Sequence, residues 1–172
     1  MKSISAITNR TELAKHFQDL GFKVGAEIGV LAGHYSKVLC TTIPHLKLYC
    51  IDSWGMGENR KKPYHLKMYE QAKVRLAPYN TKIIYKFSMD AIKDFDDNSL
   101  DFVYIDANHE PQFVTEDIRE WSKKVRTGGI VSGHDYALRI ATVVDDYVAK
   151  NNLKLNLTTL ESEHISWWFV KI

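Results

Sequence analysis

The residues best suited to chemistry are acids and histidines that lie near the ends of short apolar segments. Carboxylates can pair with an ammonium group, accept hydrogen bonds from hydroxyls or share a cation, and histidine exchanges a proton near neutral pH. If the apolar segments are neighbouring parallel strands, these side chains meet at one edge of a sheet, where ligands bind in doubly wound folds. The candidates are Glu27, Asp52, Asp106, His109, His134 and Asp135.

A loop with two glycines follows the first apolar segment. Its pattern, Glu27-x-Gly29-x-x-x-Gly33, lets the backbone turn tightly, but it lacks the Gly-x-Gly-x-x-Gly spacing that binds a pyrophosphate. S-adenosylmethionine has no phosphate. Glu27 can face its ammonium group, directly or through water, and backbone N–H groups near Gly33 to Tyr35 can meet its carboxylate. The alternative is a plain strand-to-helix turn with a solvated glutamate. The predicted cofactor contacts here are Glu27, Gly29, Val30, Gly33, Tyr35 and Ser36.

Asp52 ends the second apolar segment. A carboxylate at this place can accept hydrogen bonds from both hydroxyls of a ribose, which suits any adenosine cofactor, NAD included. The alternative is an aspartate that caps a helix or turn. Ser53 and Trp54 follow it and are also predicted cofactor contacts. The loop at 53–63 is long for this position, so we consider it a candidate lid in which Trp54 or Tyr64 forms a wall.

The third apolar segment is followed by a stretch where an adenine ring can lie. Ser88 and Met89 are the predicted contacts, and either Ser88 or Asp90 can bond the ring. Each of these two polar residues can equally be the N-cap of the helix that follows, because serine and aspartate are both favoured there. The two interpretations stay open at this stage.

Apolar and amphipathic segments alternate along most of the chain, which implies right-handed crossovers and a parallel sheet covered on both faces. The first helix has the form of a capping box at Asn9 and Glu12, and Gly21 ends it. Gly128-Gly129 are expected to break the fifth helix. The last two strands have no helix between them, so the final strand runs antiparallel to its neighbour. Helices are expected at 9–20, 34–42, 64–76, 90–94, 114–125 and 143–148, and strands at 23–28, 48–51, 83–85, 100–105, from 130, 153–157 and 165–170.

The composition is that of a globular protein. The 172 residues are 45% hydrophobic and 26% charged, which fits one domain at 1–172 with an N-terminal helix at 1–21 and a catalytic core at 22–172. A net charge of +2 is too weak to argue for nucleic acid or an anionic membrane as partner. Cys40 and Cys50 are interpreted as small core residues and not as a disulfide or metal pair. No signal peptide or membrane span is recognisable, so a cytoplasmic protein is expected.

Four strings at the expected strand ends resemble the class I S-adenosylmethionine-dependent methyltransferases, and most of all the branch with macrocin-type O-methyltransferases. The resemblance covers about residues 20 to 150. It implies an α/β fold: a Rossmann-like, doubly wound, mostly parallel seven-stranded sheet with an antiparallel C-terminal hairpin strand and helices on both faces. It also implies S-adenosylmethionine as donor and often a divalent metal at the fourth and fifth strand ends. The strings are Gly25–Val30, Ile51–Trp54, Tyr104–His109 and Gly128–Tyr136.

Asp106 and Asp135 close the fourth and fifth strands. Adjacent strands lie about 4.8 Å apart, so the two carboxylates can share a cation, and oxygen ligands favour Mg²⁺. A metal would acidify a substrate hydroxyl and aim its oxygen at the sulfonium methyl. Catechol-type relatives have a basic proton acceptor three residues after the first aspartate, which implies that role or a ligand role for His109. They also have asparagine after the second aspartate, where this chain has Tyr136. His134 precedes Asp135 instead, so a transition metal also fits.

Three functions are open. The first is metal-assisted O-methylation of a small hydroxylated molecule, in which Asp106 and His109 are catalytic and the metal ligands come from Asp106, His109, His134 and Asp135. The second is metal-free methylation of nitrogen or a carboxylate. The third is a non-catalytic module that binds S-adenosylmethionine. Polar strand ends without a metal, with structural histidines, remain the alternative for the cluster. A short chain has few insertions to build a selective pocket, so a homo-oligomer that completes it is a hypothesis.

Overall fold

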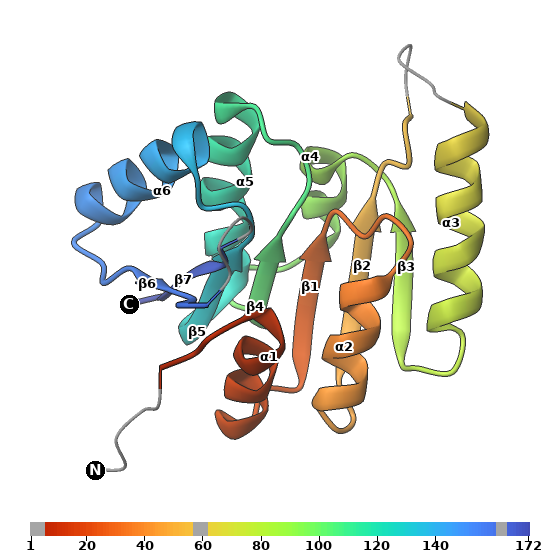
Figure 1. The fold of residues 1–172 in the computed structure, drawn as a ribbon, viewed down its shortest axis with the longest axis horizontal. Helices are drawn as coiled ribbons and strands as arrows, with labels where there is room; N and C mark the ends of the chain where they lie inside the picture. The colour runs from red at the N-terminus through yellow and green to blue at the C-terminus, as the bar shows by residue number, and fades with distance from the viewer. Residues whose placement is uncertain (1–5, 57–61, 161–164) are drawn as a thin grey trace.

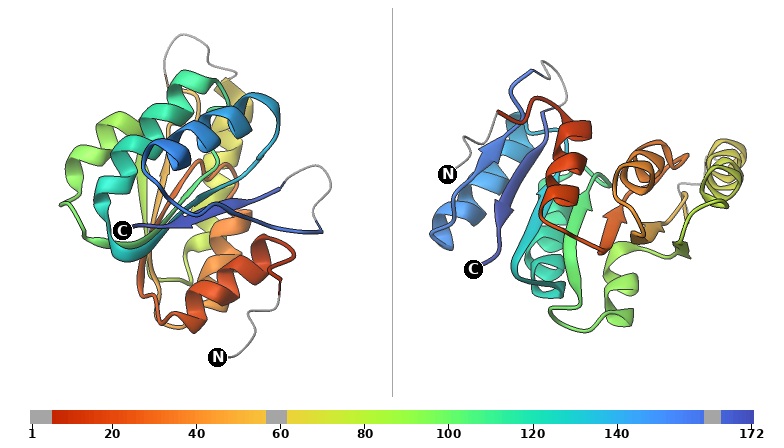
Figure 2. Two further views of the ribbon diagram at one scale, coloured as in Figure 1. Left: turned by 90° about the vertical axis from the view of Figure 1, so that its left-hand side faces the viewer. Right: turned by 90° about the horizontal axis from the view of Figure 1, so that it is seen from below.

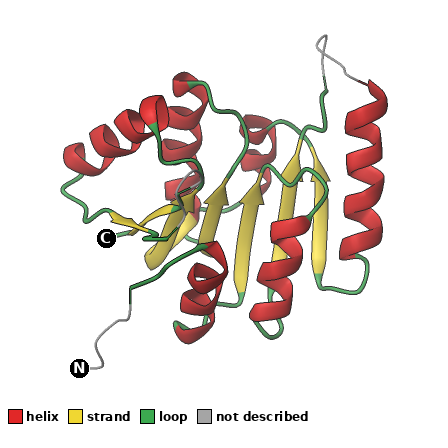
Figure 3. Cartoon of the chain, in the orientation of Figure 1, coloured by secondary structure: helices red, strands yellow, loops and turns green. Residues whose placement is uncertain are grey.

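A computed structural model describes residues 6–56, 62–160 and 165–172 (Figure 1). Strands and helices alternate along the chain, and the strands gather in one sheet (Figure 3). The strands are β1 (Val24–Ile28), β2 (Lys47–Asp52), β3 (Thr81–Tyr85), β4 (Leu100–Ile105), β5 (Val125–Gly133), β6 (Asn156–Leu157) and β7 (Trp167–Val170). The helices are α1 (Arg10–Asp19), α2 (His34–Thr42), α3 (Lys62–Leu76), α4 (Ser88–Ala91), the 3-10 turn η1 (Ile92–Asp94), α5 (Pro111–Lys124) and α6 (Leu138–Lys150).

Within the described residues the sheet has seven strands in the order β3-β2-β1-β4-β5-β7-β6. The pairs among β1 to β5 are parallel, whereas β7 pairs antiparallel with both β5 and β6. This arrangement confirms the predicted fold class. The chain reverses its direction along the sheet after β3, so β1 and β4 lie side by side at the switch point. Ligands bind beyond the carboxyl ends of strands at such a point.

Helices cover both faces of the sheet (Figure 2). Along β4, Phe102 and Tyr104 pack in the cluster with α1, α2 and α3, whereas Val103 and Ile105 pack in the cluster with α4, α5 and α6. This alternation follows from the two-residue period of a strand. A strand that is apolar on both faces is therefore held from both sides, and its last residues have a fixed position at the sheet edge.

The first helix begins as the sequence predicts. The Asn9 side chain accepts hydrogen bonds from the backbone N–H groups of Thr11 and Glu12. Glu12 reaches back one residue further than a standard capping box, because its carboxylate accepts from the backbone and hydroxyl of Thr8. Gly21 follows with a φ of +75°, a conformation that favours glycine and ends the helix.

The prediction for the start of β5 was wrong. Val125 continues the apolar period of α5, but it lies in β5, and Gly128-Gly129 lie within that strand and do not precede it. The register between β4 and β5 shifts here, with Leu100 opposite Val125 and Phe102 opposite Ile130. The glycines belong to this irregularity. A Cβ at Gly129 would collide with the carbonyl oxygen of Asp101.

Smaller differences concern element ends. The short helix begins at Ser88 and not at Asp90, and the strand expected at 153–157 is confined to Asn156–Leu157. Other predictions are confirmed: Cys40 and Cys50 are free thiols, and the tryptophans and phenylalanine of β7 are buried. Part of the candidate lid, residues 57–61, lies outside the described residues. Among the described helices, none has the length and apolar character needed to cross a membrane.

Candidate active site

A cavity of about 1190 Å³ opens at the carboxyl ends of β1 to β4. The loops after these strands line it with residues 28–32, 51–53, 86–89 and 106–109. Side chains from α5 also line the cavity. The loops come from strands that are buried on both faces, so the sheet fixes where each loop begins. The cavity is thus where a doubly wound fold is expected to bind a ligand.

Glu27 lies at the base of this cavity and is 2% exposed. The Ser36 hydroxyl donates a hydrogen bond to its carboxylate. Burial raises the pKa of Glu27 to about 8, because a charge is poorly solvated there, while the Ser36 hydrogen bond and the charge of Arg10 lower it. A buried acid of this kind is ready for a cationic group, because an ammonium beside it would restore the charged form.

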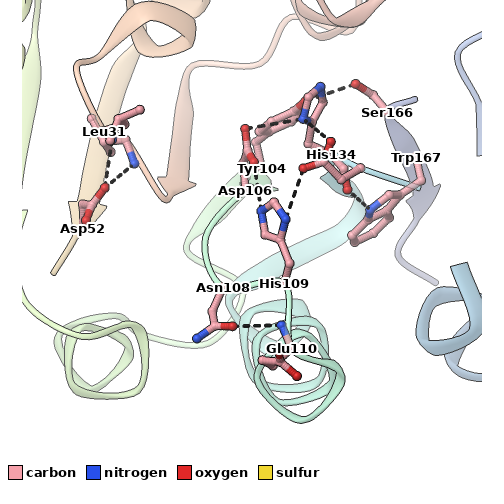
Figure 4. Close-up of polar contacts among 12 residues, drawn as sticks. Leu31, Asp52, Tyr104, Asp106, Asn108, His109, Glu110, His134, Ser166 and Trp167 are labelled. Carbon is pink, nitrogen blue, oxygen red and sulfur yellow. Dashed lines mark hydrogen bonds and ion pairs between the residues drawn. The ribbon is translucent and has the colours of Figure 1, made fainter. Parts of the chain in front are cut away.

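Asp52 braces the glycine loop. Its Oδ2 accepts from the backbone N–H groups of Val30 and Leu31, at 2.9 and 2.8 Å, and Figure 4 shows Leu31 beside it. Its Oδ1 accepts from the backbone N–H of Trp54 at 2.7 Å. Leu31 and Trp54 both have positive φ, 50° and 38°, a strained backbone that these hydrogen bonds help to hold. A carboxylate has about four acceptor positions, so one remains for a ligand hydroxyl. The brace therefore leaves room for one of the two ribose hydroxyl contacts that the sequence predicts for Asp52.

Some predicted contacts lie behind the cavity wall. Trp54 is 3% exposed, its indole N–H donates to the Leu31 carbonyl at 2.7 Å, and its rings pack against Tyr69 and Tyr85. Trp54 is absent from the described cavity lining, as are Gly33, Ser36 and Tyr64, whereas Ser53, Ser88 and Met89 contribute to it. Trp54 therefore shapes the site through its hydrogen bond to Leu31, and Ser36 does so through its hydrogen bond to Glu27. Asp90 is exposed and pairs with Lys93.

Among the cavity-lining residues that sequence reasoning missed are Arg10 and Asp117. The Arg10 guanidinium lies 5.1 Å from the centre of the Tyr35 ring, and the Tyr35 hydroxyl donates to the Arg10 carbonyl at 3.0 Å. No local pattern signals this contact, because it depends on how α1 docks against α2. Asp117 did leave a signal, since it sits between Val114 and Trp121 on the apolar face of α5.

Two acids and two histidines meet at the ends of β4 and β5, as predicted (Figure 4). His109 Nδ1 is 3.4 Å from an Asp135 oxygen, and its Nε2 is 3.9 Å from an Asp106 oxygen. His134 Nδ1 is 3.7 Å from Asp106 and 3.2 Å from Asp135. Burial raises the pKa of Asp106, and the nearby Asp135 carboxylate adds to this effect, whereas His134 opposes it. The side chain of His109 is 55% exposed, so it is open to a substrate.

The donor set fits a divalent cation. Asp106, His134 and Asp135 each offer one ligand atom, and these atoms lie within 4.8 Å of one another. Oxygen ligands alone would favour Mg²⁺. Because this set combines two carboxylates with an imidazole, it can also bind transition metals. Tyr136, which stands where catechol-type relatives have asparagine, donates its hydroxyl to Asp145 on α6 at 2.6 Å and is directed away from the cluster.

Comparison with known families decides the enzyme class. A family profile described as "Methyltransferase domain" matches residues 26–136, from β1 to the end of the Asp135 loop. The chain belongs to this methyltransferase family. The match confirms the predicted class of enzyme, an S-adenosylmethionine-dependent methyltransferase. Among curated proteins, none matches the chain.

Solved methyltransferases share the fold of this methyltransferase at low identity. An O-methyltransferase from Bacillus cereus in complex with SAH is 15% identical with a TM-score of 0.69, covering 94% of this chain and 80% of that one. The O-methyltransferase TomG from Streptomyces achromogenes, involved in tomaymycin synthesis and solved with SAM, is 15% identical at 0.70, covering 100% and 84%. An rRNA methylase from Streptococcus thermophilus is 13% identical at 0.70, covering 98% and 99%. The likeness extends to enzymes with very different acceptors, so it establishes the fold alone.

Proposed function

We propose that this methyltransferase carries the methyl group of S-adenosylmethionine to an oxygen of a small hydroxylated molecule, with a divalent cation at the ends of β4 and β5. The observation that carries the proposal is that the buried acid Glu27 and the Asp106–His109 loop open on the same cavity. Methyl transfer is a direct displacement, so alignment of oxygen, methyl and sulfur supplies much of the rate. The macrocin-type O-methyltransferases are the branch that this chemistry favours.

The donor half of the site uses the loops after β1, β2 and β3. Glu27 pairs with the donor's ammonium, and the first turn of α2, at His34 and Tyr35, offers backbone N–H groups to its carboxylate. Asp52 accepts from one ribose hydroxyl with the acceptor position that its brace leaves open. The adenine lies beside Ser88 and Met89. The Glu27 carboxylate complements the charge of the donor's ammonium, the other contacts are made to its carboxylate, ribose and adenine, and none requires a phosphate.

The acceptor half uses the β4 and β5 ends. Asp106, His134 and Asp135 would hold the cation, which when bound lowers the pKa of a substrate hydroxyl. His109 takes the hydroxyl proton, and the carboxylates on either side of it stabilise the resulting imidazolium. The acceptor oxygen forms the new bond to the methyl carbon. The sulfur–carbon bond breaks with its electron pair on sulfur, which leaves S-adenosylhomocysteine.

One observation favours a second candidate function, metal-free methylation of nitrogen or a carboxylate. His109 Nδ1 lies 3.4 Å from an Asp135 oxygen, whereas its Nε2 is 3.9 Å from Asp106. An aspartate that orients one nitrogen of a histidine leaves the other to act as a general base without a cation. The cluster itself is therefore compatible with either route, and the dependence of turnover on a cation separates them.

The test is a methyl-transfer assay with S-adenosylmethionine and a panel of catechols, phenols, amines and carboxylates, run with and without EDTA. We expect turnover with a hydroxylated acceptor, a loss of at least about 100-fold with chelator, and recovery on adding Mg²⁺ or Mn²⁺. Asp135→Asn should remove the recovery. Asp145→Asn on α6, outside the cluster, should keep it. Full turnover in excess chelator would exclude the metal step and favour the second candidate.

A further inference from the structure

The strongest unassigned feature is a buried relay between the β3 loop and α5. The Trp121 indole N–H donates to the Ser88 hydroxyl oxygen at 2.8 Å, and the Ser88 hydroxyl donates to Asp117 Oδ1. The serine hydrogen is therefore committed to the aspartate. Ser88 therefore has no free hydroxyl hydrogen to donate to a purine ring in the cavity.

Asp117 is the polar group of this relay that remains available. It is 3% exposed and lines the cavity, and in the described part of the chain its Oδ2 has no hydrogen-bond partner. Every fully buried side-chain oxygen of the described residues does have a partner, so Oδ2 keeps some exposed surface, and the cavity that Asp117 lines is the space open to it. Burial raises the pKa of Asp117 to about 6, against the Ser88 hydrogen bond, so at neutral pH the carboxylate is an acceptor without a proton to donate.

The surroundings of this acceptor are those of a flat, apolar ring. Phe87 and Met89 flank Ser88 and line the cavity, and Phe113 lines it from the turn of α5 before Asp117. A ligand group here must be aromatic and must carry a hydrogen-bond donor at its edge. A 6-aminopurine has this combination, whereas a 6-oxopurine would bring its oxygen against the carboxylate.

We propose that Asp117 recognises the 6-amino group of the donor's adenine, and that Ser88 acts as the residue that positions this carboxylate. The inference rests on the proposed use of S-adenosylmethionine. It assigns base recognition to α5 and moves it away from the two residues favoured by sequence, Ser88 and Asp90. Glu27, on β1, keeps the ammonium group.

The test compares two ligands by isothermal titration at pH 7.5: S-adenosylhomocysteine and S-inosylhomocysteine, which differ at the 6-position of the purine. We expect the wild-type protein to bind the adenosyl ligand about 10- to 100-fold more tightly. This is the range expected when a hydrogen bond to a charged group is lost and that group is left unpaired in the inosyl complex. Equal affinities would overturn the proposal without any variant. Failure to bind either ligand would instead count against the proposed function.

Variants locate the preference. In Asp117→Asn the carboxamide can donate to a 6-oxo group, so the affinity ratio should fall to about one or invert; an unchanged ratio would overturn the proposal. Ser88→Ala should reduce the ratio by a smaller factor, and Ser88→Thr, which keeps the hydroxyl, should restore it. Asp90→Asn is the matched control. Asp90 is exposed and pairs with Lys93, and it is absent from the described cavity lining, which includes Ser88 and Met89. It should keep the wild-type ratio.

Discussion

The two halves of the cavity are built in different ways. On the β1–β2 side, Asp52 accepts three backbone N–H groups and the Trp54 indole holds the Leu31 carbonyl. On the β4–β5 side, carboxylate–histidine pairs join the acids and histidines, Figure 4 also joins His134 to Ser166, and His109 is more than half exposed. Backbone hydrogen bonds keep their geometry at any ordinary pH. Pairs between carboxylates and histidines depend on protonation and on any cation that joins them.

The difference teaches which half is formed before a ligand arrives. The loop that meets the donor has its shape without help from the donor, so binding it costs little ordering. In the proposed mechanism, the acceptor half would acquire its final geometry with the cation and substrate. The halves meet at Gly29, where a Cβ would collide with the Asp106 carbonyl. A shift in one half would therefore be felt in the other.

The largest effect should come from the acceptor half. His109→Ala removes the proposed proton acceptor while the backbone of the glycine loop keeps its hydrogen bonds, so kcat should fall about 10²- to 10⁴-fold. The affinity for S-adenosylhomocysteine should stay within about twofold. Steady-state kinetics and calorimetry measure the two quantities. His45→Asn, in the exposed loop at the other edge of the sheet, is the control. A comparable loss of cofactor affinity would show that the halves are not separable.

A second effect, on the donor half, follows from Glu27. Glu27→Gln removes the charge that meets the ammonium, and we expect the affinity for S-adenosylhomocysteine to fall about 10- to 100-fold. In the wild type the pKa of free Glu27 is about 8, so binding a cation requires loss of its proton. Affinity should therefore rise as pH increases from 6 towards 8. Calorimetry across this range measures the dependence of affinity on pH. If Glu27→Gln kept the wild-type dependence, Glu27 would not be part of the donor site.

The same acid sets a stability trend of known sign. Its folded pKa of about 8 lies above its ordinary value of 4.5, so between these pH values the folded state holds a proton that the unfolded state has lost. The free energy of unfolding must then fall as pH rises through this window. The full effect is on the order of 5 kcal/mol, since a difference of one in pKa is worth about 1.4 kcal/mol. Thermal unfolding of Glu27→Gln should show a flatter pH profile from 5 to 9.

The sequence predicted the parts of this site that depend on strand ends. Asp106 and Asp135 come together because β4 and β5 are neighbours in parallel register, and the apolar period of the strands was enough to foresee it. Trp54 and Arg10 could not be placed in this way. Trp54 turns behind the loop because of its positive φ, and Arg10 reaches the cavity because α1 docks on α2; both facts are tertiary.

Val125 shows a different limit of sequence reasoning. It satisfies the apolar period of α5 and the apolar requirement of β5 equally well, so periodicity alone cannot assign it. The backbone decides, because the strand pairs Val125 with Leu100 before the glycine irregularity. Asp117 is the opposite case. An acid on an apolar helix face indicates a buried partner or a ligand, and this signal was present in the sequence without being used.

The smallest expected effect compares one tryptophan from each half. The indoles of Trp54 and Trp167 are both buried, and each donates to a backbone carbonyl, of Leu31 at 2.7 Å and of His134 at 3.2 Å. Replacing either with phenylalanine removes one hydrogen bond and part of a buried ring system, so each should lower the free energy of unfolding by about 1 to 3 kcal/mol. Chemical denaturation measures this loss.

The pair separates the halves where stability alone would not. Trp54→Phe loosens the loop that holds the donor, and the affinity for S-adenosylhomocysteine should fall a few-fold. Trp167→Phe loosens the backbone beside the acceptor cluster, so that affinity should stay at the wild-type value although the protein loses similar stability. Equal weakening of cofactor binding by both would mean that the cavity responds as one unit. In that case the two halves would differ in how their side chains are held, but this difference would not determine how tightly the cofactor binds.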